Sequence, residues 1–246
     1  MFGAESVFKA LFAFEKKKGA QTAPFFVGVG GPVGVGKSTY AEALKQFLLQ
    51  RASESDIAIE SDQVSVVSTD HFFYSQKTLF NLGVQKGDPD SYQLDSIKSF
   101  MRALCAGEEA QHPVYSHELY DIDVSSMQLV SANQRVVIVE GLNVFSTAEI
   151  ATHLDFGVLL FISPKELRNQ QAARLARSFK QTLPDYLLNS MVLDYWYRIN
   201  RPNAWRHRPK LRWRPNVIIL KTPFIQKGIA LDNGVVLDKG IVLKLP

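Results

Sequence analysis

The sequence predicts an α/β fold in which a mostly parallel sheet carries helices on both faces. Two observations predict it. Short apolar runs, typical of buried strands, alternate with stretches whose apolar residues recur at helical spacing. A glycine-rich turn also joins the first apolar run to the first long helical stretch. At 246 residues the chain has the length of one domain with a full core, so we expect a single domain over residues 1–246.

The expected elements alternate along the chain. Strands are expected at 25–29, 64–67, 136–139, 158–162 and 217–220. Helices are expected within 1–20, at 39–51, from Leu94 to a stop at Gly107, from Ser163 toward Lys180, and at 185–200. Residues 74–92 are expected to form a polar connection, and the tyrosine-rich stretch before residue 136 a loop. The tail at 222–246 contains Asp232-Asn233-Gly234, which signals a hairpin.

Composition narrows the classes of function. The single cysteine, Cys105, excludes an internal disulfide framework and indicates a reducing compartment, and no apolar run is long enough to span a membrane, so we expect a cytoplasmic protein. The formal charge of +4 is uneven, because seven basic and no acidic residues lie within 198–214 and the rest is net acidic. Tryptophan and tyrosine interleave with this basic stretch, which leaves a nucleotide-dependent RNA-binding regulator as an alternative.

The glycine-rich turn fits the phosphate-binding pattern G-x-x-x-x-G-K-[ST] between a strand and a helix. Glycines let successive backbone N–H groups turn toward a phosphate, Lys37 can reach the β- and γ-phosphates, and the Ser38 hydroxyl can hold magnesium. A glycine-rich turn with a surface lysine is the structural alternative. The candidate nucleotide-binding residues are Gly31, Gly34, Val35, Gly36, Lys37, Ser38 and Thr39.

Acidic residues follow two further strands, at the edge where ligands gather in open α/β sheets. Asp70 is suited to accept a proton from, or to orient, an attacking hydroxyl, although it could instead cap the turn after its strand. Glu140 is suited to hold magnesium or its water shell, although it could be an ordinary loop residue. Arg174 and Arg177, one turn apart on the helix after Ser163, could place positive charge on a transferred phosphate.

These residues resemble the bacterial type I pantothenate kinases, within the wider family that includes uridine kinase and phosphoribulokinase. The resemblance implies a three-layer P-loop kinase fold. It runs from residue 25 to residue 205 and extends beyond the phosphate loop. The matching stretches are 28–39, Ser68-Thr69-Asp70 with Phe72, 87–92, 113–117 with Tyr120-Asp121, 140–144, and Ile199-Asn200 with Pro202-Asn203.

The resemblance implies an enzyme that uses ATP and Mg²⁺ to phosphorylate a primary hydroxyl, with pantothenate as the leading acceptor. It implies ATP binding at Lys37, Ser38 and Thr39 and catalysis by Asp70. It places Tyr115, His117, Arg174 and Asn200 against the acceptor. It also suggests a homodimer. A kinase of another small acceptor, such as a nucleoside, a sugar or glycerate, stays open as an alternative.

The chain departs from this family's pattern around the acceptor and the inhibitor. Glu42 stands where the family has an arginine that binds coenzyme A, which argues against feedback inhibition by coenzyme A. Gln171 replaces a tyrosine, and His71 replaces the glycine that follows the catalytic aspartate. Leu175 and Ser178 replace aromatic residues. We therefore expect an altered acyl end of the acceptor pocket.

Overall fold

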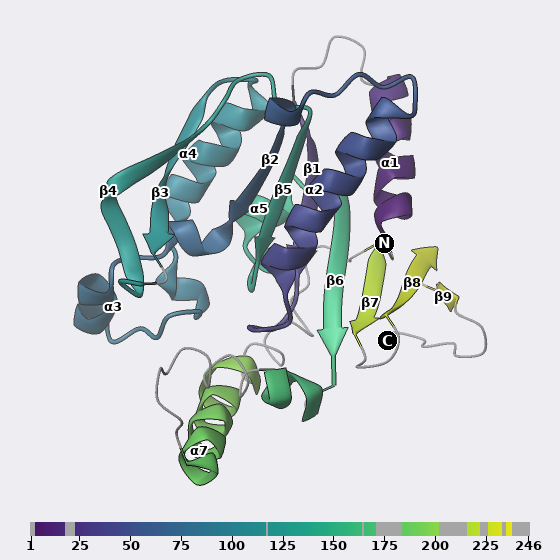
Figure 1. The fold of residues 1–246 in the computed structure, drawn as a ribbon. Helices are drawn as coiled ribbons and strands as arrows, with labels where there is room; N and C mark the ends of the chain where they lie inside the picture. The colour runs from purple at the N-terminus through teal and green to yellow at the C-terminus, as the bar shows by residue number, and fades with distance from the viewer. Residues whose placement is uncertain are drawn as a thin grey trace.

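The computed structural model describes residues 3–17, 23–116, 118–163, 165–170, 184–201, 216–221, 226–232 and 235–237. Its main sheet has the strand order β2-β5-β1-β6-β7-β8-β9 (Figure 1). The first five of these strands are parallel and confirm the expected ones. They are β2 (Val64–Ser68), β5 (Val136–Gly141), β1 (Phe25–Gly30), β6 (Phe156–Ile162) and β7 (Val217–Lys221).

One face of the sheet is covered by α1 (Ala4–Lys17) and α2 (Lys37–Ser53). Helical spacing puts Tyr40, Leu44, Phe47 and Leu48 on one stripe of α2. The structure buries Tyr40, Leu44 and Leu48 and half-buries Phe47, and the stripe packs on strand residues such as Val27 and Ile138. The apolar side chains of the N-terminal helix, among them Val7 and Leu11, belong to the same cluster. Helix α1 is therefore held on the domain by packing its apolar side against α2 and the sheet.

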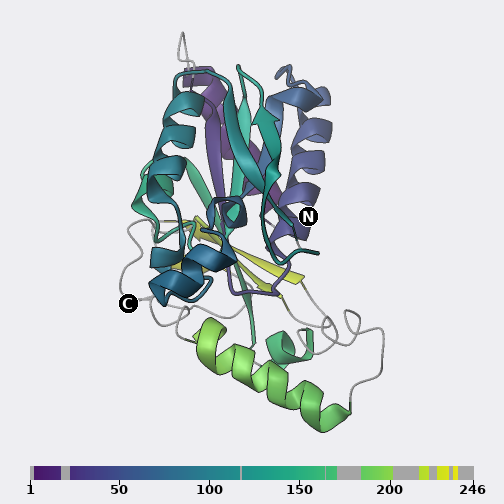
Figure 2. The same cartoon turned by 90° about the vertical axis from the view of Figure 1, so that its left-hand side faces the viewer.

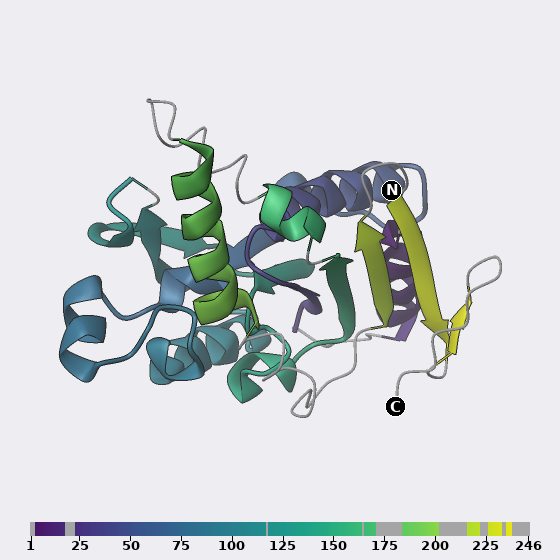
Figure 3. The same cartoon turned by 90° about the horizontal axis from the view of Figure 1, so that it is seen from below.

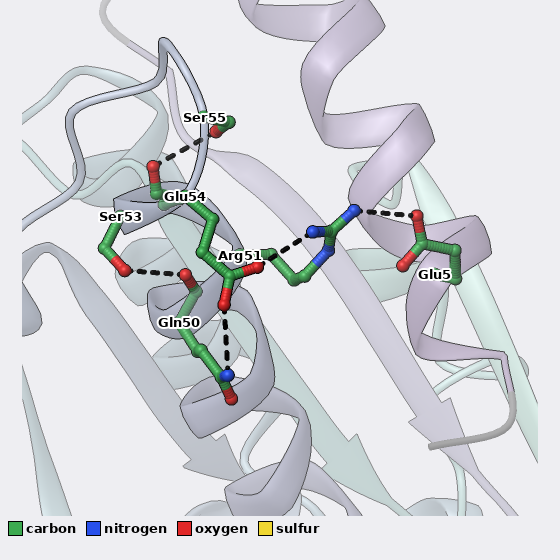
Figure 4. A network of polar contacts seen from close by, with 7 residues as sticks. Glu5, Gln50, Arg51, Ser53, Glu54 and Ser55 are labelled. Atoms are coloured by element: carbon green, nitrogen blue, oxygen red, sulfur yellow. Dashed lines mark hydrogen bonds and ion pairs between the residues drawn. The ribbon is translucent and has the colours of Figure 1, made fainter.

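Charged side chains fasten α1 at both ends. Arg51 near the end of α2 reaches Glu5 at 3.3 Å and Glu54 at 2.9 Å (Figure 4). At the other end of α1, Arg135 Nε donates to Glu15 Oε1 at 3.1 Å. The exposed Arg51–Glu5 pair contributes little, about 0.2–1 kcal/mol. The buried apolar side therefore holds α1, and the ion pairs fix its position along the sheet.

The opposite face carries α4 (Leu94–Cys105), α5 (Ala148–Ala151) and a two-stranded sheet, β3 (Ala110–Ser116) with β4 (Asp121–Val130). Helical spacing puts Leu94, Ile97, Met101 and Leu104 on one face of α4. Ile97, Met101 and Leu104 are buried in a second core cluster, but Leu94 is 42% exposed. Figure 2 shows α4 and α2 on opposite sides of the main sheet. The expected arrangement of three layers, with helices on both faces of a mostly parallel sheet, is confirmed.

Two loop predictions were wrong. The polar connection at 74–92 contains α3 (Gln76–Leu82), capped by the Ser75 hydroxyl, and the short 3-10 turn η3 (Pro89–Ser91). The tyrosine-rich stretch forms β3 and β4, whose pairing shifts register between Pro113 and Val114. Pattern reasoning missed this hairpin because Pro113 and the register shift beside it break the alternation that would mark its strands.

The C-terminal hairpin signal is confirmed, since Asp232 of β8 (Gln226–Asp232) pairs with Val235 of β9 (Val235–Leu237). Both strands are antiparallel additions to the main sheet. Helix α7 (Asp185–Tyr195) continues into the π-helical turn η4 (Trp196–Asn200) and lies beyond the carboxyl ends of the parallel strands (Figures 1 and 3). Residues 165–170 are helical after the predicted Ser163 cap, whose hydroxyl accepts from the Glu166 N–H at 3.2 Å. In the described part of the chain, no helix has both the length and the apolar character needed to cross a bilayer.

Candidate active site

The register of the parallel strands brings three strand ends to one place. Glu140, near the end of β5, pairs with Val29 of β1 on one side and with Ser68 of β2 on the other. The phosphate loop leaves β1 immediately after this level, and the 3-10 turn η2 (Thr69–Phe72) leaves β2. The sheet therefore aligns the loop, Glu140 and Asp70 at its carboxyl edge, where the sequence predicted them to meet.

The phosphate loop adopts a conformation that its glycines make possible. Gly36 is left-handed, at φ 91° and ψ 38°, and directly precedes the first residue of α2. A side chain on Gly31 would place its Cβ 2.6 Å from the Leu160 carbonyl oxygen of β6. The loop thus closes tightly over the sheet and delivers the N-terminus of a 17-residue helix to its centre. Such a helix end binds anions.

Lys37 lies over this loop. Its Nζ donates a hydrogen bond of 3.2 Å to the Pro32 carbonyl oxygen, so the ammonium is folded back across the turn. Val35, between the two, is fully buried and anchors the loop to the core. A phosphate seated in the loop would therefore meet both backbone N–H groups and a positive charge.

Ser38 and Glu140 make direct contact. The Ser38 hydroxyl donates to Glu140 Oε1 at 2.9 Å, and the Glu140 residue is only 5% exposed. A hydroxyl and a carboxylate oxygen directed at one point are hard donors that suit Mg²⁺, which keeps water and phosphate oxygens as its other ligands. No group of three or more His, Cys, Asp or Glu side chains that could hold a metal occurs among the described residues. The pair therefore fits a metal that is shared with a bound phosphate.

Asp70 lies in η2. The sequence left open that Asp70 only caps this turn, but the residue that caps it is Ser68. The Ser68 hydroxyl caps this turn by accepting from the Asp70 N–H at 3.3 Å. Thr69, next to it, is 1% exposed and packs so closely on Gly141 that a Cβ there would lie 1.8 Å from Thr69 Oγ1. This contact fixes the Asp70 turn against the end of β5, where Glu140 lies.

Lys86 is a candidate functional residue that sequence reasoning missed. Its Nζ lies 3.4 Å from the centre of the Tyr115 ring and 4.8 Å from that of Tyr120. Burial lowers the pKa of Lys86 to about 8, although the nearby carboxylates of Asp70 and Asp121 favour its charged form. A partly desolvated ammonium close to a carboxylate is typical of functional sites.

The loop that carries Lys86 is held by buried polar groups. Asn143, 1% exposed, donates from Nδ2 to the Gly87 carbonyl oxygen at 3.0 Å, and the Gly87 N–H donates to the Ser91 hydroxyl at 3.2 Å. The first bond joins the 87–92 and 140–144 stretches, and the second closes the turn within 87–92. The signal that could have identified Lys86 was its position directly before Gly87-Asp88-Pro89.

The predicted acceptor residues are described in part. Tyr115 lies on β3, 8% exposed, and its ring meets Phe73 edge-on at 6.5 Å between centroids. The backbone of Asn200 lies in η4 beyond the strand ends. His117, Arg174, Arg177 and Gln171 lie outside the described residues.

The fold and the site together define a P-loop kinase, an ATP-dependent phosphotransferase with an alcohol group as acceptor. The chain belongs to the phosphoribulokinase / uridine kinase family, whose sequence model matches residues 26–181.

Relatives and solved structures agree with this class. A pantothenate kinase of Lactococcus lactis subsp. lactis (strain IL1403) is 32% identical over 227 residues, which cover 84% of this chain and 71% of that protein. D-glycerate 3-kinase of Cryptococcus neoformans var. grubii superposes with a TM-score of 0.64 at 13% identity, covering 88% of this chain and 94% of the other. Phosphoribulokinase of Rhodobacter spheroides superposes at 0.52 and 14% identity, covering 87% and 78%. At these identities the two structures show a shared fold.

Proposed function

We propose that this protein transfers the γ-phosphoryl group of ATP to the primary hydroxyl of pantothenate, which yields 4′-phosphopantothenate, the first intermediate toward coenzyme A. The observation that carries the proposal is the meeting of the phosphate loop, the Ser38–Glu140 pair and Asp70 at one sheet edge. The choice of acceptor is supported by the pantothenate kinases that match 84% of the chain at 32% identity.

In the proposed reaction the acceptor hydroxyl oxygen forms a bond to the γ-phosphorus while the bond from that phosphorus to the β–γ bridging oxygen breaks. Asp70 orients the hydroxyl and takes its proton, and ADP leaves. Lys37 and the loop N–H groups hold the β- and γ-phosphates. Because the loop and the Asp70 turn are both fixed to the sheet, the nucleophile and the phosphate meet with little reorganisation.

Ser38 and Glu140 would hold Mg²⁺ in this enzyme. The metal would neutralise phosphate charge, as it does in phosphoryl transfer generally. Glu140 is well suited to this because the neighbouring strands bury it and fix its direction. Thr39, the next residue of α2, would contact the nucleotide from the exposed side of the loop.

The acceptor would lie between the Asp70 turn and the β3–β4 hairpin. Tyr115 would form one wall, and the Lys86 ammonium over its ring would place positive charge beside the reacting oxygens. His117, Arg174 and Asn200 would complete the pocket and contact the carboxylate and amide groups of pantothenate. The cytoplasmic location and the homodimer that the resemblance suggests remain predictions.

An acceptor panel tests the proposal. ADP release by the purified protein with ATP and Mg²⁺ is compared across pantothenate, uridine, cytidine, ribulose 5-phosphate, fructose and glycerate. We expect kcat/KM for pantothenate to exceed every other value by at least about 100-fold, which is below the roughly 10⁴-fold that a site built to hydrogen-bond its substrate can reach. A higher value for glycerate or a sugar would keep the kinase and reassign its acceptor.

A further inference from the structure

The segment that carries Asp70 is bonded directly to the hairpin that carries Tyr115. The backbone N–H of Tyr115 donates a hydrogen bond of 2.9 Å to Nδ1 of His71, the residue after Asp70. In a two-stranded sheet each strand has one edge without a partner strand, and the buried polar groups of that edge need other partners. On β3, the His71 ring supplies such a partner to Tyr115.

This bond requires His71 to be neutral. Nδ1 accepts a hydrogen only through its lone pair, so the ring proton of a neutral His71 lies on Nε2, and an imidazolium would carry hydrogen on both nitrogens. Protonation would therefore replace an acceptor with a donor that faces the Tyr115 N–H. Unperturbed histidine makes this change between pH ~5 and ~8.

Of the two stacked rings, His71 and His112, only His71 is placed to take up a proton in acid. His112 of β3 stacks on His71 with ring centroids 4.5 Å apart and planes 20° apart, and His112 is 1% exposed. Its Nδ1 lies 2.8 Å from the Pro113 carbonyl oxygen, and its Nε2 is buried with no hydrogen-bond partner in the described part of the chain. Burial lowers the pKa of His112. His71, which is only half-buried, is the ring of this pair that acid can reach.

We propose that His71 is a positioning residue for the acceptor: its neutral ring fastens the Tyr115 segment of the hairpin to the Asp70 turn and releases it in acid. Among the residues that the structure describes, the titratable groups around it include Asp70 on its own turn, His112 and Tyr115 on β3, and Lys86 across the Tyr115 ring. The part of Tyr115 in acceptor binding belongs to the proposed function, on which this inference rests. The hydrogen bond from the Tyr115 backbone N–H to His71, which we call the lock, can be measured without any acceptor.

Two substitutions separate the hydrogen bond from the ring. His71→Asn keeps an acceptor oxygen at the position of Nδ1 and removes the titration. His71→Phe keeps the ring and its stack on His112 and removes the acceptor. For His71→Phe we expect KM for the acceptor to rise about tenfold while KM for ATP changes less than twofold, since an unpaired buried N–H is costly. For His71→Asn we expect an acceptor KM within about threefold of wild type at pH 7.5, without the rise in acid that we expect of wild type.

Hydrogen exchange at the Tyr115 amide tests the lock itself, with the Ile138 amide in the centre of β5 as reference. In the wild type we expect the Tyr115 amide to lose protection, relative to Ile138, when the pH falls from 7 to 5. In His71→Asn we expect the Tyr115 amide to stay protected at both pH values. In His71→Phe we expect it to be unprotected at both. Equal protection in wild type and His71→Phe, or the same acid loss in His71→Asn, would overturn the proposal. If His71→Phe fails to fold, the comparison of wild type with His71→Asn decides alone. A protein that passes this test but does not phosphorylate pantothenate would keep the lock and lose only the acceptor assignment.

Discussion

The Ser38 hydroxyl donates a hydrogen bond of 2.9 Å to Oε1 of Glu140. This contact joins the first turn of α2 to the end of β5, two segments more than 100 positions apart in the chain. Two oxygens that a bound Mg²⁺ would share are thus already directed at each other. The register of the sheet and the start of α2 together bring the two proposed Mg²⁺ ligands into contact.

Ser38→Ala removes one of these oxygens. We expect the Mg²⁺ concentration for half-maximal activity to rise about 10- to 100-fold, in line with the loss of groups that orient a metal site. A Mg²⁺ titration of the steady-state rate measures the effect. Ser53→Ala is the matched control, because that hydroxyl lies exposed at the other end of α2 and donates only to the Gln50 carbonyl oxygen. Equal Mg²⁺ requirements in both variants would remove Ser38 from the metal site.

Asp70→Asn keeps the shape of the side chain and removes its basicity. We expect kcat to fall about 10³-fold with the ATP dissociation constant within twofold of wild type, because general-base catalysis contributes 10²- to 10⁴-fold. Asp62→Asn, on an exposed turn before β2, should leave both values unchanged. Stopped-flow kinetics and nucleotide titration separate chemistry from binding. A near-normal rate for Asp70→Asn would show that another group receives the proton.

The lowered pKa of Lys86 predicts that activity falls at alkaline pH. Its pKa of about 8 lies below the ordinary lysine value, so kcat/KM for the acceptor should fall as the pH rises through about 8 and the ammonium loses its proton. Between pH 8 and the ordinary lysine pKa, Lys86 binds more protons in the unfolded chain than in the folded protein. The free energy of unfolding should therefore rise with pH in this range, while activity falls.

Lys86→Arg tests this, since arginine stays charged throughout and should remove the alkaline limb. Lys86→Met should lower kcat/KM roughly 100-fold at pH 7. Lys77→Met on the exposed side of α3 is the control. An alkaline limb that persists in Lys86→Arg would assign it to another group.

Gly141→Ala tests the contact between the ends of β5 and β2. A methyl group there would overlap Thr69 Oγ1 at 1.8 Å, so Thr69 and the adjoining Asp70 must move. We expect a loss of about 2 kcal/mol in the free energy of unfolding and a larger proportional loss in kcat than in ATP affinity. Gly83→Asn is the control, because a Cβ there meets nothing within 4 Å and asparagine tolerates its left-handed backbone. Chemical denaturation and kinetics on both variants give the comparison.

Coenzyme A is expected to inhibit this protein weakly. Glu42 lies exposed one turn into α2 and accepts a hydrogen bond of 3.1 Å from Gln46, so it presents negative charge beside the predicted phosphate site. Glu42→Arg should strengthen inhibition by coenzyme A, and Glu42→Gln should strengthen it less. Inhibition constants at two salt concentrations check both. Tight inhibition of the wild type would show that Glu42 does not face the inhibitor.

The parallel core was predictable because its strands are apolar runs, three of which end in chemically distinctive residues. Buried strands on both faces leave a continuous apolar signal, and Asp70 and Glu140 stand where such strands end. The hairpin was not predictable in this way. Val114 and Tyr115 follow a register shift at Pro113, so the alternation that marks a strand is lost where it matters most.

Contacts between distant segments were also beyond sequence reasoning. The position of Lys86 directly before Gly87-Asp88-Pro89 is its one local signal, because the rings that its ammonium contacts come from distant segments, Tyr115 and Tyr120 of the hairpin and Phe73. The bond from Tyr115 to His71 spans 44 positions and involves a backbone group, which leaves no trace in side-chain patterns. The chemistry of the phosphate loop, by contrast, is local and can be read from eight consecutive residues.

Phosphorus NMR of a reaction that contains the protein, ATP, Mg²⁺ and pantothenate tests the central claim most directly. The account predicts a new phosphomonoester signal on pantothenate that grows in step with ADP, and its absence with Lys37→Ala. ADP with inorganic phosphate alone, or no turnover until another acceptor is supplied, would contradict the assignment of pantothenate as the substrate.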